Sequence, residues 1–207
     1  IDELVTDRTL VGAVELELFA GECVGLAGPN GAGKSTLLHA IAVAEGVSVS
    51  THGNRFAGFA PAQIALVPDR VSNFFVTDAL DRELRRADKI AGATAGLTRL
   101  TLESILGRDV ESDLQTHPLD LSVGTQLALA TAMQLSHKPT MLLLDEPAQG
   151  LDPKARVLMA ETIRCVQETG CSILFATHDR EFASLVGNRV LEIRGSRLHQ
   201  IGEEAHL

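Results

Sequence analysis

Cysteine, clustered positive charge and long apolar runs are all scarce in this sequence of 207 residues. Its three cysteines, Cys23, Cys165 and Cys171, form no CxxC pair and no cluster with histidine, which favours buried thiols in a reducing compartment over disulfides or a zinc site. The formal net charge is −9 and no Lys/Arg cluster occurs, so duplex nucleic acid is not an expected partner. No segment approaches the roughly 18 uninterrupted apolar residues of a membrane-spanning helix.

The composition that remains is typical of a folded globular protein. Apolar residues make up 45% of the chain and charged residues 22%, and no repeat or low-complexity tract occurs. At about 100–200 residues per domain, the length predicts a single domain over residues 1–207. The cytoplasm is the expected compartment.

Short apolar runs separated by helical patterns predict an α/β fold with a mostly parallel sheet. The runs lie at residues 23–27, 64–67, 141–144 and 172–176, and each is continuous, as in parallel strands buried on both faces. Near the N-terminus, Val14, Leu16 and Leu18 alternate with glutamates, which predicts a strand of an antiparallel sub-sheet with one exposed face.

Residues 76–136 carry helical patterns instead, at 77–89 and 100–106. They are predicted to form a helical sub-lobe inserted in the core. Asp152 and Pro153 mark the start of a further helix, because Asp caps helices and Pro suits the first helical position. That helix is predicted to run to about Glu168.

A glycine-rich segment, Gly28-Pro29-Asn30-Gly31-Ala32-Gly33-Lys34-Ser35, separates the first predicted strand from a predicted helix. It fits the pattern G-x-x-x-x-G-K-S/T in the context that forms a phosphate loop. Backbone N–H groups would face the β-phosphate, Lys34 would reach the β- and γ-phosphate oxygens, and Ser35 would offer a hydroxyl to Mg²⁺. The predicted nucleotide-binding residues here are Asn30, Gly31, Ala32, Gly33, Lys34, Ser35 and Thr36. The alternative is a glycine-rich turn with a chance lysine.

Polar residues end two of the other predicted strands. Asp145 and Glu146 follow the run at 141–144, an arrangement that presents Asp145 to Mg²⁺ and Glu146 to an attacking water. His178 follows the run at 172–176 and is placed to contact a γ-phosphate, because α/β sheets bind ligands at the carboxyl ends of their strands. Each has a simpler interpretation: a buried strand with a hydrated end for the acids, and a loop histidine beside a helix-capping Asp179.

In order and spacing, these motifs resemble those of the nucleotide-binding domain of ABC ATPases over nearly the whole chain. The shared motifs are the phosphate loop, Leu121-Ser122-Val123-Gly124-Thr125-Gln126, Leu144-Asp145-Glu146-Pro147, Gly150-Leu151-Asp152 and Thr177-His178-Asp179. The resemblance implies ATP hydrolysis with Mg²⁺. It also implies a second ABC ATPase domain as partner, because two domains of this family sandwich two ATP molecules head to tail.

The same resemblance implies individual roles. Glu146 is expected to be the general base and His178 the switch histidine. Asp152 is expected to be the acid of the communication loop. Ser122 and Gly124 are expected to contact an ATP held by the partner domain, since the amides that open the following helix form an anion site.

The sequence departs from the family at several positions. Asp69 follows the run at 64–67 where the family has Gln, and it could ligate Mg²⁺ as an oxygen donor. Val123 replaces Gly and Thr125 replaces Gln in the Leu-Ser-x-Gly motif, which predicts reduced activity because Val lacks the backbone freedom of Gly. The aromatic residue that stacks on adenine is absent, so Arg8 or a residue upstream of Ile1 would make that contact.

Residues 67–80, which include the pair Phe74-Phe75, resemble a loop of energy-coupling-factor and cobalt-type transporter ATPases that docks on a membrane subunit. Residues 117–122 are similar to the second ATPase half of tandem versions of these proteins. The alternative for Phe74 and Phe75 is burial in the core of the helical sub-lobe.

The leading hypothesis is an ATP-hydrolysing ABC subunit or domain that powers uptake of a small micronutrient, such as a vitamin or a metal ion. The resemblance implies a transmembrane subunit as a further partner and a peripheral position on the cytoplasmic face of the membrane. One alternative is a soluble ABC ATPase that acts on nucleic acid or ribosomes. Another is a nucleotide-dependent binding module of low turnover, which the departures at Asp69, Val123 and Thr125 favour.

Overall fold

A six-stranded sheet is the centre of the computed structural model, which describes residues 4–6, 9–11, 16, 18–43, 49–51, 54–56, 64–194 and 197–201. The strand order is β10-β9-β3-β8-β7-β6. These strands are β3 (Cys23–Ala27), β6 (Ile64–Val67), β7 (Met141–Asp145), β8 (Ser172–Thr177), β9 (Arg189–Arg194) and β10 (Arg197–Gln200). All neighbours are parallel except β10, which pairs antiparallel with β9. The predicted α/β class with a mostly parallel sheet is confirmed.

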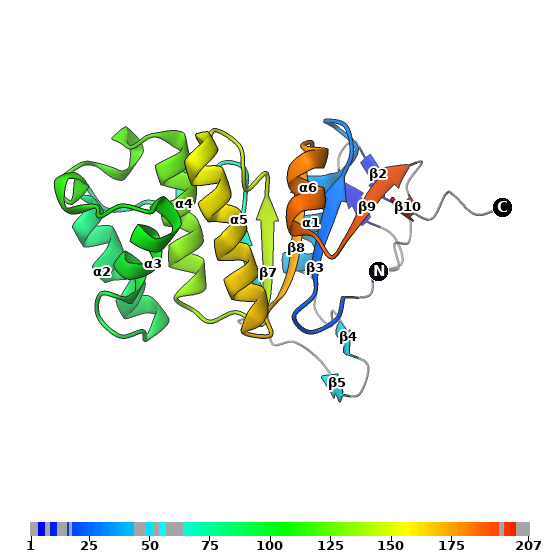
Figure 1. The fold of residues 1–207 in the computed structure, drawn as a ribbon, viewed down its shortest axis with the longest axis horizontal. Helices are drawn as coiled ribbons and strands as arrows, with labels where there is room; N and C mark the ends of the chain where they lie inside the picture. The colour runs from blue at the N-terminus through cyan, green and yellow to red at the C-terminus, as the bar shows by residue number, and fades with distance from the viewer. Residues whose placement is uncertain are drawn as a thin grey trace.

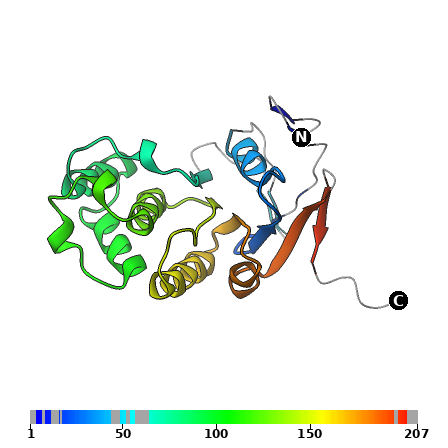
Figure 2. The same cartoon turned by 90° about the horizontal axis from the view of Figure 1, so that it is seen from above.

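The parallel strands are buried on both faces, as their continuous apolar runs predicted. Val24 and Leu174 pack with α1 (Lys34–Val43) on one face. Cys23 and Phe175 belong to a larger core cluster on the other face, with residues of α5 (Pro153–Glu168) and α6 (Arg180–Val186). Figure 2 shows α1 on one side of the sheet and α5 and α6 on the other.

Antiparallel pairs are present near the N-terminus, but not where the alternation at Val14–Leu18 placed a strand. They are β1 (Leu4–Thr6) with β2 (Thr9–Val11), and β4 (Val49–Thr51) with β5 (Asn54–Phe56). Val14 lies outside the described residues, and Leu16 and Leu18 lie in no strand. Leu18 is buried against the α1 side of the sheet. Both leucines pack against this side of the sheet without pairing in a strand, so the prediction was wrong for these two residues.

Three helices gather at one end of the molecule, and we refer to residues 80–135 as the helical lobe (Figure 1). The helices are α2 (Leu80–Ala91), α3 (Leu97–Leu106) and α4 (Val123–Leu135), with 3-10 turns η3 (Glu111–Asp113) and η4 (Pro118–Asp120) between them and η2 (Ser72–Phe74) before them. The lobe follows β6 and precedes β7, so it projects from the sheet between two neighbouring strands.

Local contacts at the helix ends explain the residues at which the helices begin. Helix α2 begins at Leu80, not at residue 77, because the Glu83 carboxylate accepts a hydrogen bond from the backbone N–H of Thr77 at 2.9 Å and holds it outside the helix. Helix α3 begins after Gly96, whose φ of 88° is left-handed, earlier than the predicted residue 100. Helix α5 begins at Pro153 and ends at Glu168 as predicted, with Asp152 accepting a hydrogen bond from Ala155 N.

Candidate functional site

A polar cavity of about 390 Å³ lies at the carboxyl ends of the parallel strands. It is lined by Asn30, Gly31, Gly33, Lys34, Ser35, Thr36, Asp69, Glu146, Gln149 and His178. These residues follow β3, β6, β7 and β8, which end at the same edge of the sheet because they are parallel. The fold therefore brings most of the predicted site residues into one cavity. Gln149 was not singled out in the sequence, since it belongs to no recognised position of a motif.

The phosphate loop is shaped by glycines in left-handed conformations. Gly31 and Gly33 have φ values of 82° and 93°, which other residues adopt at a cost. The Lys34 side chain is buried and folds back across the loop, where its ammonium donates to Gly28 O at 2.8 Å and to Pro29 O at 3.1 Å. Helix α1 starts at Lys34, so its N-terminal amides open toward the cavity. A phosphate group is the kind of anion that this arrangement binds.

Asp145 is buried at the end of β7 and has no hydrogen-bond partner among the described residues for either carboxylate oxygen. Burial raises the pKa of Asp145, the nearby Ser35 hydroxyl lowers it in part, and the carboxylates of Asp69 and Glu146 raise it further. Such a group is stabilised by a cation. Ser35, Asp69 and Asp145 together offer hydroxyl and carboxylate oxygens, the ligands that Mg²⁺ prefers. The donor set therefore fits Mg²⁺ completed by phosphate oxygens and water.

Glu146 is held in a specific orientation at the mouth of the cavity. Its φ is 52°, a left-handed value that is uncommon for a residue with a side chain and occurs often at functional sites. Its backbone N–H donates to Ala176 O at 2.8 Å. Its carboxylate accepts hydrogen bonds from the Thr177 hydroxyl at 3.1 Å and from His178 N at 3.0 Å, and the His178 Nδ1 lies 2.9 Å from Oε2. The end of β8 thus fixes the carboxylate at the cavity.

Three predicted site residues, Ser122, Gly124 and Asp152, are absent from the lining of this cavity. Ser122 caps α4, accepting from Thr125 N at 3.2 Å and sharing a hydrogen bond of 2.9 Å with the Thr125 hydroxyl. Asp152 caps α5. Ala32 and Asp145 are not among the lining residues either, although Ala32 lies within the phosphate loop and Asp145 lies beside Glu146.

The start of α4 packs tightly on the loop that precedes α5. A Cβ added at Gly124 would lie 2.9 Å from Leu151 Cδ2 and 3.2 Å from Gly150 O. Val123, which stands where the family has Gly, is 65% exposed and contacts the position that a Cβ on Gly150 would occupy. The Leu-Ser-x-Gly motif and the communication loop therefore form one continuous surface, separate from the lining of the cavity.

Arg156 connects α5 to the loop that carries His178, a link that no motif of the sequence indicated. Its guanidinium forms an ion pair with Asp179 and lies 5.5 Å from the centre of the Phe182 ring. Asp179 in turn caps α6 by accepting from Phe182 N at 2.9 Å. This backbone hydrogen bond, together with Arg156, lowers the pKa of Asp179. The charge pair joins the first turn of α5 to the residue after His178.

Phe74 and Phe75 are part of the core rather than a free loop. Phe75 is 9% exposed within the larger core cluster, and Phe74 is half-buried against it. Phe74 also lines a small cavity of about 170 Å³ with Ile90 and His137. The core interpretation therefore holds for Phe75. Arg8, the candidate for adenine stacking, lies outside the described residues.

The cysteines behave only in part as predicted. Cys23 and Cys171 are buried, and burial raises the pKa of their thiols to about 12 and about 11. Cys165 is exposed on α5, because it lines an open cavity beside that helix instead of packing in the core, so the prediction of buried thiols was wrong for it. No helix in the described part of the chain is long and apolar enough to cross a membrane.

Comparison with known proteins places these features in context. A family model described as ABC transporter matches residues 11–149. A putative ABC transporter ATP-binding protein of Streptomyces avermitilis is 36% identical over 201 residues, covering 94% of this chain and 35% of that protein. The Nod factor export ATP-binding protein I of Sinorhizobium fredii is 33% identical, covering 92% of this chain and 57% of its own length. A sulfate/thiosulfate import ATP-binding protein of Brucella melitensis is 32% identical, with 91% and 55% covered.

Solved structures share the fold. The structure of an ATP-binding subunit of an ABC transporter superposes with a TM-score of 0.75 at 24% identity, covering 95% of this chain and 85% of that one. A dimeric bacterial ABC transporter cassette gives a TM-score of 0.71 at 20% identity, with 96% and 93% covered. The chain thus spans most of each solved domain, but only about a third of the Streptomyces relative and little more than half of the other two proteins.

Proposed function

The chain belongs to the ABC transporter ATPase family, and we propose that it binds and hydrolyses MgATP as one ATPase unit of a transporter. The observation that carries this proposal is the single cavity in which the phosphate loop, Asp69, Glu146 and His178 meet. It combines an anion site, the Asp69 carboxylate and the Ser35 hydroxyl as oxygen donors for Mg²⁺, and the Glu146 carboxylate positioned as a base, with the buried Asp145 next to Glu146 at the end of β7. These are the parts that hydrolysis of a nucleoside triphosphate needs.

In this proposal the nucleotide phosphates lie along the phosphate loop. The ammonium of Lys34 leaves the carbonyls of Gly28 and Pro29 and pairs with phosphate oxygens, while the α1 amides receive the remaining negative charge. Ser35, Asp145 and Asp69 would hold Mg²⁺. When bound, the ion neutralises the phosphate oxygens. A neighbouring cation also removes the penalty of the buried, unpartnered Asp145 charge.

Glu146 is the proposed general base. Its carboxylate accepts a proton from the attacking water, and its left-handed backbone and its bonds to Thr177 and His178 keep it at the cavity while it does so. His178 is 56% exposed, so its ring is also accessible to the γ-phosphate. In this arrangement His178 orients Glu146 on one side and contacts the substrate on the other.

A second ABC ATPase domain is the proposed partner. Ser122, Gly124 and Asp152 lie on a surface that does not line the chain's own cavity, so they would contact an ATP bound by that second domain. The partner is either a second copy or a different ATPase half, and the similarity of residues 117–122 to the second half of tandem ATPases favours the latter. The bulky, exposed Val123 also suits a pairing with a different domain.

For the transport step we propose a transmembrane subunit that holds the chain at the cytoplasmic face and takes up a small micronutrient, a vitamin or a metal ion. The support is the likeness of residues 67–80 to energy-coupling-factor and cobalt-type ATPases. The cavity beside Phe74, with the exposed Ile90 at its rim, is the proposed docking point. Ile90→Asp should abolish co-purification with the membrane subunit, whereas Leu185→Asp, an exposed site on α6, should not.

The proposed function is tested by MgATP turnover across a range of chain concentrations, beside Glu146→Gln and with ATP binding measured in both. Turnover per chain that rises with concentration and is lost in Glu146→Gln supports a homodimeric ATPase. ATP binding without turnover at any concentration supports a need for a different ATPase half or a membrane subunit. Absence of ATP binding would contradict the proposal.

Asp69 has its own test, because it stands where the family has Gln. If the chain is a binding module of low turnover, Asp69→Gln raises turnover. If Asp69 is a working Mg²⁺ ligand, the same change lowers turnover and raises the Mg²⁺ concentration that half-maximal activity requires.

A further inference from the structure

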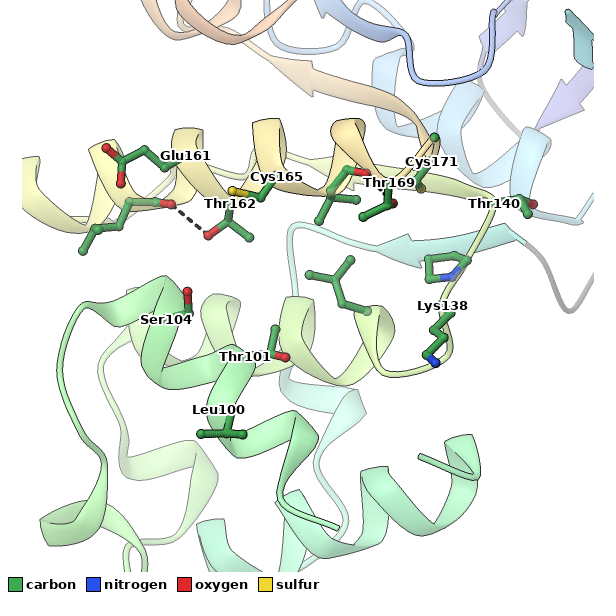
Figure 3. Close-up of a pocket in the computed structure, with 15 residues that line it drawn as sticks. Leu100, Thr101, Ser104, Lys138, Thr140, Glu161, Thr162, Cys165, Thr169 and Cys171 are labelled. Carbon is green, nitrogen blue, oxygen red and sulfur yellow. Dashed lines mark hydrogen bonds between the residues drawn. The ribbon is translucent and has the colours of Figure 1, made fainter. Parts of the chain in front are cut away.

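A second cavity, larger than the nucleotide cavity, lies between the helical lobe and α5 (Figure 3). Its volume is about 860 Å³, within the range of about 300–1,000 Å³ that small-molecule sites occupy. Its walls come from α3, from α5 and from the connection between α4 and β7. It shares no lining residue with the nucleotide cavity.

Much of the lining of this second cavity is apolar. Leu100, Leu135, Leu158 and Val166 contribute side chains to it. The Thr162 hydroxyl also lines it but donates to a backbone carbonyl of its own helix, at 2.8 Å to Leu158 O. The Thr101 and Thr169 hydroxyls are used in the same way, at 2.9 Å to Leu97 O and 2.6 Å to Val166 O. These walls therefore offer few hydrogen-bond donors to a ligand and favour a hydrocarbon body.

The two ends of the second cavity carry opposite charges. Figure 3 shows Lys138 and Thr140 at one end and Glu161 and Ser104 at the other. Along α5 the lining of the cavity extends from Glu161 to Thr169, which is about two turns, or about 12 Å at 1.5 Å per residue. Lys138 and Glu161 form no ion pair with any residue that the structure describes, so each charge is available to a ligand.

We propose that this second cavity binds an amphipathic monocarboxylate, with the carboxylate at Lys138 and an apolar chain of medium length extended toward Ser104. The lining supplies one cation and one anion, at opposite ends. An acid with a single charged end satisfies Lys138 and places hydrocarbon, not charge, near Glu161. A dicarboxylate of the same length would place its second charge near the exposed Glu161 and bind more weakly. The site does not depend on nucleotide binding.

Ligand binding can be followed by the rate of alkylation of Cys165, because this residue lines the second cavity and is exposed. The nucleotide-free chain is alkylated with iodoacetamide and followed by mass spectrometry, with decanoate as the probe. At ten times the half-protecting concentration, decanoate should slow alkylation of Cys165 about tenfold by mass action. Cys23 serves as the internal control, since it is buried, burial raises the pKa of its thiol, and it does not line the second cavity.

The charge assignment is tested by Lys138→Glu, which should raise the half-protecting concentration of decanoate about fivefold or more. Lys154→Glu makes the same change of charge at an exposed position on the first turn of α5, outside the lining of the second cavity, and should leave that concentration unchanged. Decanedioate should protect less than decanoate at the same concentration. Ser104→Phe, which adds bulk at the far end of the cavity, should weaken decanoate without changing the charge.

Other results would overturn the proposal. They include the absence of protection by decanoate, protection that Lys138→Glu does not weaken, and equal protection by decanedioate or by decylammonium. Labelling of Cys23, which is buried outside the second cavity, in the presence of decanoate would show that the acid loosens the fold instead of occupying the cavity, and would also overturn the proposal.

Discussion

Replacing Asp145 by asparagine should make the nucleotide-free chain more stable and at the same time remove its response to MgATP. Asp145 is 1% exposed, and neither of its carboxylate oxygens has a hydrogen-bond partner among the described residues. An ionised group in that position is removed from water, and the nearby Ser35 hydroxyl and His39 compensate for this only in part. Asparagine removes the charge and keeps the size of the side chain.

The expected gain follows from the cost of leaving a buried polar group unsatisfied, about 1–3 kcal/mol and more for a charged group. Part of that cost remains in the variant, because the asparagine amide is polar and also lacks partners. We therefore expect Asp145→Asn to raise the free energy of unfolding by about 1–3 kcal/mol. For a chain of this size each kcal/mol shifts Tm by about 2–4 °C, so Tm should rise by several degrees.

The dependence on pH has a definite sign. Burial raises the pKa of Asp145 in the folded state, so the folded chain binds a proton at a pH where the unfolded chain does not. Linkage then makes stability rise as the pH falls through the folded-state pKa toward the unfolded one. This contribution should be present in the wild type and absent in Asp145→Asn.

Thermal unfolding of both proteins measures these effects, with and without MgATP. At an MgATP concentration one hundred times Kd, the free energy of unfolding of the wild type should rise by about 2.7 kcal/mol. The free energy of unfolding of Asp145→Asn should rise much less in the presence of Mg²⁺. Asp69→Asn is the matched control, because Asp69 is exposed and its neutralisation should leave the nucleotide-free Tm nearly unchanged. A lower Tm for nucleotide-free Asp145→Asn would contradict this prediction, since it would mean that the surroundings stabilise the buried carboxylate well.

Three further changes test other parts of the structure. Glu83→Ala should lower the free energy of unfolding by about 1–3 kcal/mol, because the buried Glu83 carboxylate accepts hydrogen bonds from Thr77 and pairs with Arg86, which is 30% exposed and stays hydrated in the variant. Urea denaturation measures the loss, and a loss below about 0.5 kcal/mol would contradict the prediction. Arg156→Ala should lower kcat about tenfold, or about 1.4 kcal/mol, with the KM for ATP unchanged, because the guanidinium holds the loop that carries the proposed catalytic histidine. Arg156→Lys should keep part of the wild-type kcat. An unchanged kcat in Arg156→Ala would exclude a positioning role. Gly124→Ala should leave ATP binding intact but reduce turnover, because the added methyl group would contact Leu151 at 2.9 Å; unchanged turnover would show that this packing can relax.

The helical lobe shows where sequence patterns are reliable and where they are not. The helices were expected in about the right places, because their apolar periodicity is local. The start of α2 was misplaced, because the Glu83 carboxylate competes for the N–H of Thr77 and only the folded side-chain contact reveals that. The alternation at Leu16 and Leu18 was misassigned to a strand, since apolar side chains can pack against the sheet without strand pairing.

The pair Phe74-Phe75 shows that a sequence pattern does not predict whether a side chain is buried. Two adjacent aromatic residues in a loop suggested an anchor for a partner, with core packing as the alternative. Whether such side chains are exposed depends on what packs above them, and here the cluster of helices and strands encloses Phe75. A pattern of neighbouring residues carries no information on that packing.

The order of amino acids alone specified the local features: the phosphate loop with its glycines and Lys34, the capping aspartates such as Asp152, and the apolar runs that became parallel strands. Each depends on residues adjacent along the chain. Packing in three dimensions determined which distant residues meet. It joined Glu146 to His178, left the Asp145 carboxylate buried without a partner among the described residues, and opened a second cavity between α3 and α5. Desolvation, long-range contacts and empty volume arise only when separate segments pack together, and no local pattern encodes them.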